Sequence, residues 1–282
     1  MIIISGANGQ LGRGIVEELL KRVPASQVGV SVRDAQKAQD LAARGVRVRQ
    51  ATYDDPDSLA QAFEGAQQVL IVSVNSTGEQ ALHQHRTALD QAVAAGAGRI
   101  LYTSHVGASS ASPFEPMRDH AATEAALRSS GVPFTVLRNG FYANTVPQML
   151  GQAFTTGDLA LPADGPISWT THADLAEATA VLLTRPATSE SLTVNLAGQA
   201  VDFQEVARVA SEIGGRPVVR TVVTDDDFRK ALLSRGLPDA LAAMTLGIFQ
   251  ASRLGQFSVN DPSLTQLLGR APTALKAFLT GA

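Results

Sequence analysis

The sequence contains no cysteine, which excludes disulfides, thiolate nucleophiles and zinc sites built on cysteine. No run of about 18 apolar residues is present, so no membrane-spanning helix is expected. The apolar N-terminal residues have no basic leader and do not form a signal peptide pattern. Charged residues are only 17% of the chain and the net charge is −3, without the basic stripe that binds nucleic acid. These absences favour a cytoplasmic enzyme or ligand-binding protein that binds neither membranes nor nucleic acid.

Short apolar runs alternate with helical patterns through the first half of the 282 residues. The pattern predicts strands over residues 2–5, 28–32, 46–48, 69–72, 99–103 and 134–137. It predicts helices over residues 11–20, 35–44, 56–63, 79–95 and 118–129. Strands that alternate with helices indicate right-handed crossovers, and so an α/β fold with a doubly wound parallel sheet covered on both faces.

The second half shows a weaker pattern. Glycine, proline and threonine are frequent over residues 151–171, which predicts loops, and helices are predicted over 174–183, 203–213 and 225–233. We expect residues 1–138 to form the main domain. Residues 139–282 are expected to form a smaller α/β lobe that adds a strand or two to the sheet and covers a cleft. Segments of the two can interleave, and a monomer or homodimer is expected.

A glycine-rich turn directly follows the first predicted strand and opens the first helix. Its glycines are Gly6, Gly9 and Gly12. Glycine lets the backbone approach a pyrophosphate closely, and the helix N-terminus offers free N–H groups to the phosphates. This position between strand and helix predicts a dinucleotide site of the Rossmann type, the alternative being a tight turn without ligand. The predicted cofactor-binding residues here are Gly6, Asn8, Gly9, Gln10, Leu11 and Gly12.

The end of the second strand bears on the choice between NADP and NAD. An arginine there accommodates the 2′-phosphate of NADP, whereas an acidic residue binds the ribose of NAD. The chain has Arg33 followed by Asp34, with Lys37 close by. Arg33 favours NADPH, with NADH as the other option. The alternatives are that Arg33 is a solvated surface charge, and that Asp34 either caps the next helix or binds a ribose.

Together these residues resemble the NmrA-like branch of the atypical short-chain dehydrogenases. Within that branch the chain is most similar to bacterial NAD(P)H:quinone oxidoreductases and triphenylmethane dye reductases. Besides the glycine turn, the resemblance rests on Val32-Arg33, residues 49–53, Tyr102-Thr103-Ser104 and residues 131–142. It implies an NADPH-binding Rossmann domain, a small C-terminal domain and a substrate cleft between them.

The resemblance also assigns roles by position. It implies cofactor contacts at Tyr53 (adenine), Ser73, Val74 and Asn75 (ribose and phosphates), Thr103 and Ser104 (nicotinamide half), and Asn139, Gly140 and Phe141 (nicotinamide). Phe141 and Tyr142 would border the substrate. Thr52 stands where many relatives have an acid, and Ala125 follows Glu124 where the quinone reductases carry a lysine.

The chain lacks the Tyr-x-x-x-Lys pair that short-chain dehydrogenases use for proton transfer. The residues four positions after its three tyrosines are Asp57, Val106 and Val146. This argues against carbonyl reduction, alcohol oxidation and epimerisation by that mechanism. A quinone or cationic dye is a strong hydride acceptor that needs no tuned acid, so proximity can supply much of the rate. His120, with a reference pKa near 6.5, is a candidate proton donor, and a structural histidine is the alternative.

The sequence leaves other functional classes to compare with a reductase. NmrA-like proteins without catalytic residues bind NADP as redox sensors, and the missing pair leaves that option open. An isomerase or ether reductase is disfavoured, because no lysine lies in residues 118–130. The adjacent Ser104 and His105 make a poor hydrolase pair.

His83 and His85 are treated as helix surface, so no metal site is predicted. Trp169 belongs either to the cleft or to the core.

Overall fold

Seven strands form the central sheet, and all of their pairings are parallel. They are β1 (Ile2–Ser5), β2 (Val28–Val32), β3 (Arg47–Gln50), β4 (Gln68–Ile71), β5 (Arg99–His105), β6 (Phe134–Asn139) and β10 (Leu192–Leu196). Their order is β10-β6-β5-β4-β1-β2-β3. The chain leaves β1 in one direction and later returns beside it with β4, so the strand order reverses between these two strands. Parallel sheets bind ligands at such a switch point, beyond the carboxyl ends of the strands.

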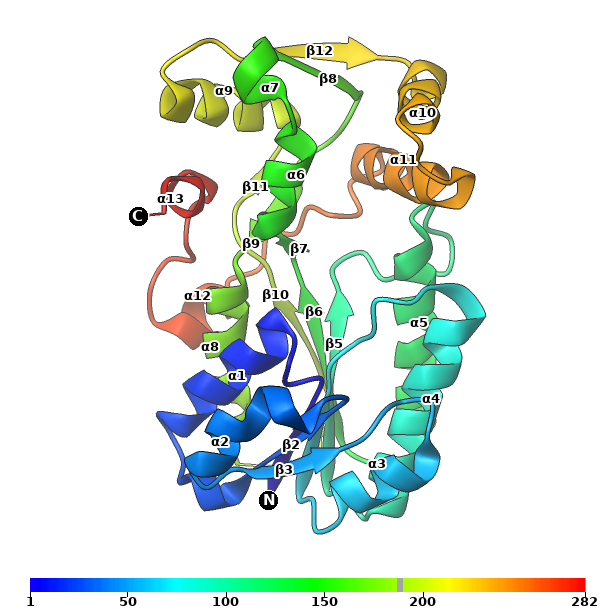
Figure 1. The fold of residues 1–282 in the computed structure, drawn as a ribbon, viewed down its shortest axis with the longest axis vertical. Helices are drawn as coiled ribbons and strands as arrows, with labels where there is room; N and C mark the ends of the chain where they lie inside the picture. The colour runs from blue at the N-terminus through cyan, green and yellow to red at the C-terminus, as the bar shows by residue number, and fades with distance from the viewer. Residues whose placement is uncertain (187–189, 282) are drawn as a thin grey trace.

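Helices cover both faces of this sheet, as the computed structural model shows for residues 1–186 and 190–281 (Figure 1). One face carries α1 (Gln10–Leu20), α2 (Gln39–Ala43), α8 (His172–Thr184) and α12 (Ser263–Leu268). The other carries α3 (Pro56–Phe63), α4 (Gly78–Ala94) and α5 (Glu115–Arg128). Among the described residues, no helix combines the length and the apolar character needed to cross a membrane.

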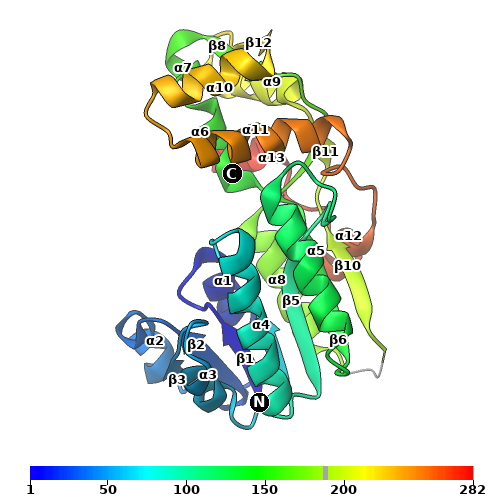
Figure 2. The same ribbon diagram turned by 90° about the vertical axis from the view of Figure 1, so that its right-hand side faces the viewer.

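A second region stands above the carboxyl ends of the strands (Figure 2). It holds two small sheets: β7 (Phe141–Tyr142), β9 (Ile167–Thr170) and β11 (Ala200–Val201) form one, and β8 (Asp158–Pro162) and β12 (Val219–Val223) the other. Its helices are α6 (Val146–Leu150), α7 (Ala153–Thr156), α9 (Phe203–Gly214), α10 (Asp225–Ser234), α11 (Asp239–Arg253) and α13 (Leu275–Thr280). This upper region has its own apolar core, separate from the two cores that line the central sheet.

The chain passes more than once between the two regions. After building β7 to β9 it returns to the central sheet as α8 and β10, and later as α12. Asp174 of α8 holds the segment that follows α12 against α8. Its buried carboxylate accepts hydrogen bonds from Arg270 Nη1 at 2.8 Å and from the backbone N–H of Thr273 at 2.8 Å. The upper region is therefore braced to the central sheet at several points along the sequence.

The α/β class and the doubly wound parallel sheet are confirmed, and two local predictions are wrong. Residues 151–171 contain β8 and β9 rather than loops alone, because these strands pair with β12 and β11, which lie far along the chain. The helix predicted over 35–44 is split into a 3₁₀ turn, Ala35–Ala38, and α2, because Ala38 leaves helical geometry at φ −121° and ψ 15°.

Candidate functional site

The glycine turn after β1 depends on two of its glycines for its own geometry. Gly6 has φ +66°, a conformation that side chains disfavour, and its carbonyl accepts from the N–H of Gly9 at 3.0 Å. A Cβ on Gly12 would lie 2.5 Å from the Gly6 oxygen, so helix α1 can approach the turn only without a side chain there. The exposed turn at residues 8–10 therefore stays close to the strand ends.

Helix α1 begins at this turn without a side-chain cap. Its N-cap is Gly9, and its first turn has no acidic residue. Uncapped N–H groups and the positive end of the helix dipole suit an anionic group. Asn8 Nδ2 donates to the carbonyl of Asp34 at 2.7 Å, and Asn144 Nδ2 donates to Gln10 Oε1 at 3.0 Å. The Leu11 side chain is buried in the core, so only its backbone faces the turn.

Arg33 lies beyond the end of β2, beside the glycine turn. Its side chain is exposed, and within the described part of the chain it makes no hydrogen bond or ion pair. Asp34 is otherwise engaged, since its Oδ1 accepts from the N–H of Gln36 at 3.0 Å and caps the next turn. Lys37 Nζ lies 3.9 Å from Asp34 Oδ2. The structure thus supports capping for Asp34 and leaves the Arg33 guanidinium available for a ligand.

The segment that follows β4 is held by side chains from three elements. Tyr53 OH donates to the carbonyl of Val72 at 2.9 Å, and burial raises the pKa of this phenol above its usual value. The N–H of Ser73 donates to Thr103 Oγ1 at 2.8 Å, and the N–H of Val74 donates to His85 Nε2 at 3.1 Å. Tyr53, Ser73, Val74 and Thr103 therefore meet at the switch point, where the predicted cofactor site lies, with Asn75 exposed beside them.

Ser104 is engaged elsewhere. Neighbouring residues of a strand point to opposite faces of a sheet, and Ser104 faces α5. Its hydroxyl donates to Glu124 Oε1 at 2.7 Å. Burial raises the pKa of the Glu124 carboxyl, but hydrogen bonds from Arg138, Ser104 and Arg128 outweigh burial and leave the pKa below its usual value. The Ser104 hydroxyl belongs to this buried ion-pair cluster rather than to the face that Thr103 shares with Ser73.

The end of β6 lies directly under the upper region. Asn139 is buried and its Oδ1 has no partner within the described residues. Gly140 is explained by packing, since a Cβ there would lie 2.6 Å from the carbonyl of Ser168 and would clash with Thr170. Tyr142 packs against the ring of His172, with centroids 4.4 Å apart. The predicted stretch is thus the crossing point between the two regions.

Four aromatic rings and one histidine converge at this crossing. We call them the aromatic cluster: Phe114, Phe141, Trp169, Phe257 and His105. Phe141 is its centre, with ring centroids 5.3 Å from His105, 5.4 Å from Trp169 and 5.3 Å from Phe257. Trp169 is 2% exposed, which settles its role as core packing. Because the members come from widely separated segments, local sequence patterns did not predict His105, Phe114 or Phe257.

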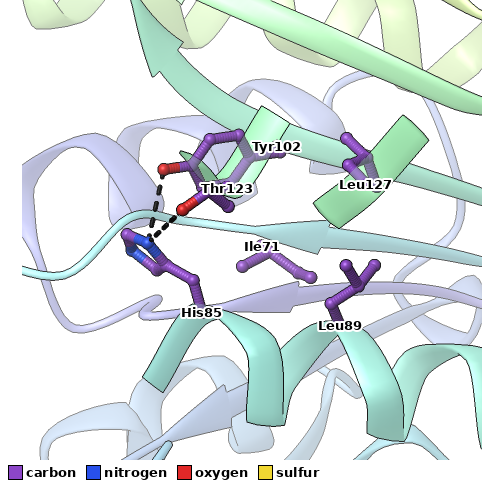
Figure 3. Close-up of a pocket in the computed structure, with 6 residues that line it drawn as sticks. All are labelled: Ile71, His85, Leu89, Tyr102, Thr123 and Leu127. Carbon is purple, nitrogen blue, oxygen red and sulfur yellow. Dashed lines mark hydrogen bonds between the residues drawn. The ribbon is translucent and has the colours of Figure 1, made fainter. Parts of the chain in front are cut away.

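A chain of polar side chains lies behind the cluster, between β5 and helices α4 and α5. Tyr102 OH lies 2.8 Å from His120 Nδ1 and 3.4 Å from His85 Nδ1. Figure 3 shows His85 reaching both Tyr102 and Thr123 at the polar end of a pocket whose other end is formed by Ile71, Leu89 and Leu127. The prediction that His85 is helix surface is wrong: it is 2% exposed, because α5 and the β4–α4 loop cover this side of α4. Burial lowers its pKa to about 4.

The chain is similar to proteins of known activity over nearly its whole length. The profile of the NmrA-like family matches residues 1–275. Quinone oxidoreductase 2 of Escherichia coli K12 is 37% identical over 277 residues, which are 98% of this chain and 96% of that protein.

Two solved structures give the same picture. The NADPH-dependent quinone oxidoreductase QOR2 of Escherichia coli, complexed with NADPH, has a TM-score of 0.93 and 36% identity, and the match covers 100% of this chain and 99% of that one. Triphenylmethane reductase of Citrobacter sp., complexed with NADP(H), has a TM-score of 0.91 and 34% identity, with 100% of both chains covered. Both matches include the central sheet and the upper region.

Proposed function

The chain belongs to the NmrA-like family, and on that premise we propose that it is a reductase that uses NADPH, with NADH as a weaker donor, to reduce a quinone or a similar aromatic acceptor. One observation carries the proposal: an uncapped glycine turn, an exposed Arg33 that has no partner within the described residues, and the aromatic cluster all lie beyond the carboxyl ends of the central strands. The turn suits a dinucleotide, and the cluster suits a flat apolar ring.

The residues present fit NADPH. The open N-terminus of α1 would hold the pyrophosphate through the N–H groups at residues 10–12. Arg33 would pair its planar fork with the 2′-phosphate. Among the residues that the structure describes, the buried acceptor Asn139 Oδ1 has no partner, as expected where a bound group completes the hydrogen bonds. Tyr53, Ser73, Val74, Asn75, Thr103 and the Gly140–Phe141 backbone would line the rest of the cofactor. When bound, NADPH would supply a hydride, which carries two electrons and one proton.

The acceptor side is built to exclude water and position a ring. Phe141 and Phe114 are buried, with 8% of each residue exposed, so a flat acceptor would meet them at the small surface that remains open. Tyr142 and His172 border the same crossing. Because none of the three tyrosines is followed by lysine at the fourth position, the proton relay of alcohol and ketone reductases is missing. An acceptor of high hydride affinity does not need that relay, which favours quinones and cationic dyes.

The test is NADPH consumption by the purified chain, followed by absorbance, with and without a series of small benzoquinones and naphthoquinones. We expect decay that depends on the acceptor, saturates with quinone and is faster with NADPH than with NADH. Tight NADPH binding without consumption in the presence of any acceptor would contradict the proposal and support a redox sensor instead.

A further inference from the structure

The hydrogen bonds of His85 on α4 and His120 on α5 bear on where each imidazole ring carries its proton. His85 Nε2 accepts the backbone N–H of Val74 at 3.1 Å, so a neutral His85 carries its proton on Nδ1. That Nδ1–H faces Thr123 Oγ1 at 2.9 Å and Tyr102 OH at 3.4 Å. The Thr123 hydroxyl proton is used on the carbonyl of Asp119 at 2.9 Å. The donors therefore run from the Val74 amide through His85 toward Thr123 and Tyr102, and Figure 3 shows the two contacts of His85.

The next hydrogen bond in this series joins Tyr102 to His120. The His85 Nδ1–H and the Thr123 hydroxyl lie on one side of the Tyr102 hydroxyl, and His120 Nδ1 lies at 2.8 Å on the other. Because His120 Nδ1 is the nearer of the two histidine nitrogens, we assign the Tyr102 hydroxyl proton to the bond with His120. A neutral His120 must then carry its proton on Nε2. Within the described residues this Nε2 has no hydrogen-bond partner, and the His120 side chain is only partly buried. One donor of fixed direction is therefore left free.

That donor lies directly beside the aromatic cluster. The rings of His120 and His105 have centroids 6.4 Å apart and an interplanar angle of 28°. His105 in turn contacts Phe141 and Phe257 edge-on. Because Nδ1 is bound to the buried Tyr102 hydroxyl, Nε2 is the ring nitrogen left for a ligand.

We propose that His120 acts as a neutral hydrogen-bond donor to the oxygen of the acceptor, and that Tyr102 and His85 are positioning residues that keep the His120 proton on Nε2. The inference rests on the proposed function and adds a substrate class to it, namely acceptors whose reduction places charge on a carbonyl oxygen. In such a reduction the quinone gains a hydride from NADPH, which is oxidised to NADP⁺, and the hydroquinone anion takes its second proton from water. His120 stabilises the oxygen while that charge develops and keeps its own proton.

The surroundings of His120 keep the ring neutral. Tyr102 and His105 face it from β5, His85 from α4, and Asp119 precedes it on α5. Burial, with smaller contributions from His105 and His85, lowers the pKa of His120 well below its usual value. The Asp119 carboxylate is engaged with the N–H of Gly78 at 2.8 Å. If His120 is a neutral donor, the rate of quinone reduction should not depend on the ionisation of His120 near neutral pH. If His120 acts as an imidazolium acid, that rate should fall as the pH rises.

The first test needs no turnover. Long-range ¹⁵N–¹H NMR spectra of the ¹⁵N-labelled chain distinguish the two neutral tautomers of each of its five histidines. We expect His120 as the Nε2–H tautomer and His85 as the Nδ1–H tautomer at neutral pH. Tyr102→Phe should leave the His85 pattern unchanged and mix the tautomers of His120. A His120 that is charged at neutral pH, or that carries its proton on Nδ1 in the unaltered chain, would overturn the proposal.

The second test compares acceptors. His120→Phe should lower kcat with benzoquinone roughly 10- to 100-fold, as expected for the loss of one preorganised donor, while His120→Gln, which keeps an N–H, should stay within about threefold. A cationic triphenylmethane dye accepts hydride on carbon without developing an oxyanion, so both variants should reduce it as the unaltered chain does. NADPH affinity is the control for folding.

The outcomes separate the two proposals. Equal losses with quinone and dye would mean that His120 is only structural. A quinone rate that falls as the pH rises from about 5 to 8 would mean an imidazolium acid. Either result overturns the neutral donor while the reductase stands. An unaltered chain that reduces no acceptor contradicts the proposed function itself, and the NMR experiment then still decides the tautomer of His120.

Discussion

The cofactor side and the acceptor side of the proposed site differ in what they are made of. The phosphate-binding part of the cofactor side is mostly backbone, namely a glycine turn, an uncapped helix start and the ends of β1, β2 and β4, with the exposed Arg33 beside it. The acceptor side is mostly side chains, namely the aromatic cluster with His120 behind it. A backbone site needs the right residues within one short segment. A side-chain site needs several elements to be held in place at once, so it depends on packing far from the ligand.

This difference predicts how each side fails. Changes at the cofactor side should act on dinucleotide binding and hardly on the acceptor. Changes at the acceptor side should alter quinone turnover or stability and leave NADPH affinity close to its original value. The following substitutions test this division, beginning with the largest expected effect.

Gly12→Ala should abolish the backbone site. Its Cβ would lie 2.5 Å from the Gly6 oxygen and 3.1 Å from Ala7 Cα, and backbone atoms cannot move aside as a side-chain tip can. We expect NADPH binding to weaken by more than about 3 kcal/mol, or more than about 100-fold in Kd, measured by fluorescence titration. Gly98→Ala, whose Cβ meets its nearest atom at 3.5 Å, is the matched control. An unchanged Kd for Gly12→Ala would show that the turn does not hold the dinucleotide.

Glu124→Ala should destabilise the packing of β5, β6 and α5 that supports the acceptor side. The Glu124 side chain is 1% exposed and pairs with Arg138 and Arg128 at 2.8 Å each. Removing one partner of a buried pair should cost about 3 kcal/mol of unfolding free energy, measured by urea unfolding. Glu64→Ala, which removes the exposed pair with Arg49, should cost less than about 1 kcal/mol.

The Glu124 cost should also depend on pH. The pKa of this carboxyl is lowered in the folded protein, so its ionised form stabilises the fold fully above its ordinary pKa of 4.5 and loses that effect as the pH falls through the folded-state pKa. The difference in stability between the unaltered chain and Glu124→Ala should shrink in acid. A difference that grows in acid would contradict this sign.

Arg33→Ala should separate the two nicotinamide cofactors. Loss of a charge-assisted contact to the 2′-phosphate should weaken NADPH binding by about 1–3 kcal/mol and leave NADH nearly unchanged, as measured by calorimetry with both. Lys37→Ala, 74% exposed in its side chain and 3.9 Å from Asp34, should have a smaller effect. Equal losses for NADPH and NADH would eliminate the phosphate role of Arg33.

Phe257→Leu should give the smallest effect and the clearest contrast with the cofactor side. It removes ring contacts to His105, Phe114 and Phe141 at centroid distances of 5.3 to 5.8 Å. We expect the binding free energy of the quinone to weaken by about 1 kcal/mol, seen as a several-fold rise in KM for quinone, with no change in the Kd of NADPH. Phe228→Leu, whose ring packs on Phe249 in the upper core, is the control. A parallel loss of NADPH affinity would mean that the two sides are not separable.

The same difference explains what the sequence could predict. The central strands and the glycine turn can be predicted from patterns within a few residues. Buried parallel strands are continuous apolar runs, and Gly6 and Gly12 are required by contacts within the turn itself. β8 and β9 were not predicted, because each is short and pairs with a strand far along the chain.

The acceptor side was predicted only in part. Phe141 and His120 were identified, but their partners were not. His105 and Phe257 lie far apart in sequence and meet only when the upper region packs on the sheet. Ser104 and Tyr102 share a face of β5 that α5 covers, which shows only when that helix is in place. Side-chain sites of this kind become visible after folding, when tertiary contacts decide which face of each element is buried.

The most direct test of this two-sided site is a crystal structure of the chain with NADP⁺ and a hydroquinone bound together. The account predicts the pyrophosphate over the turn at Gly6–Gly12, the 2′-phosphate at Arg33, and the hydroquinone ring against Phe141 with one hydroxyl at His120 Nε2. A hydroquinone bound away from the aromatic cluster, or a dinucleotide whose phosphates do not contact the glycine turn, would contradict it.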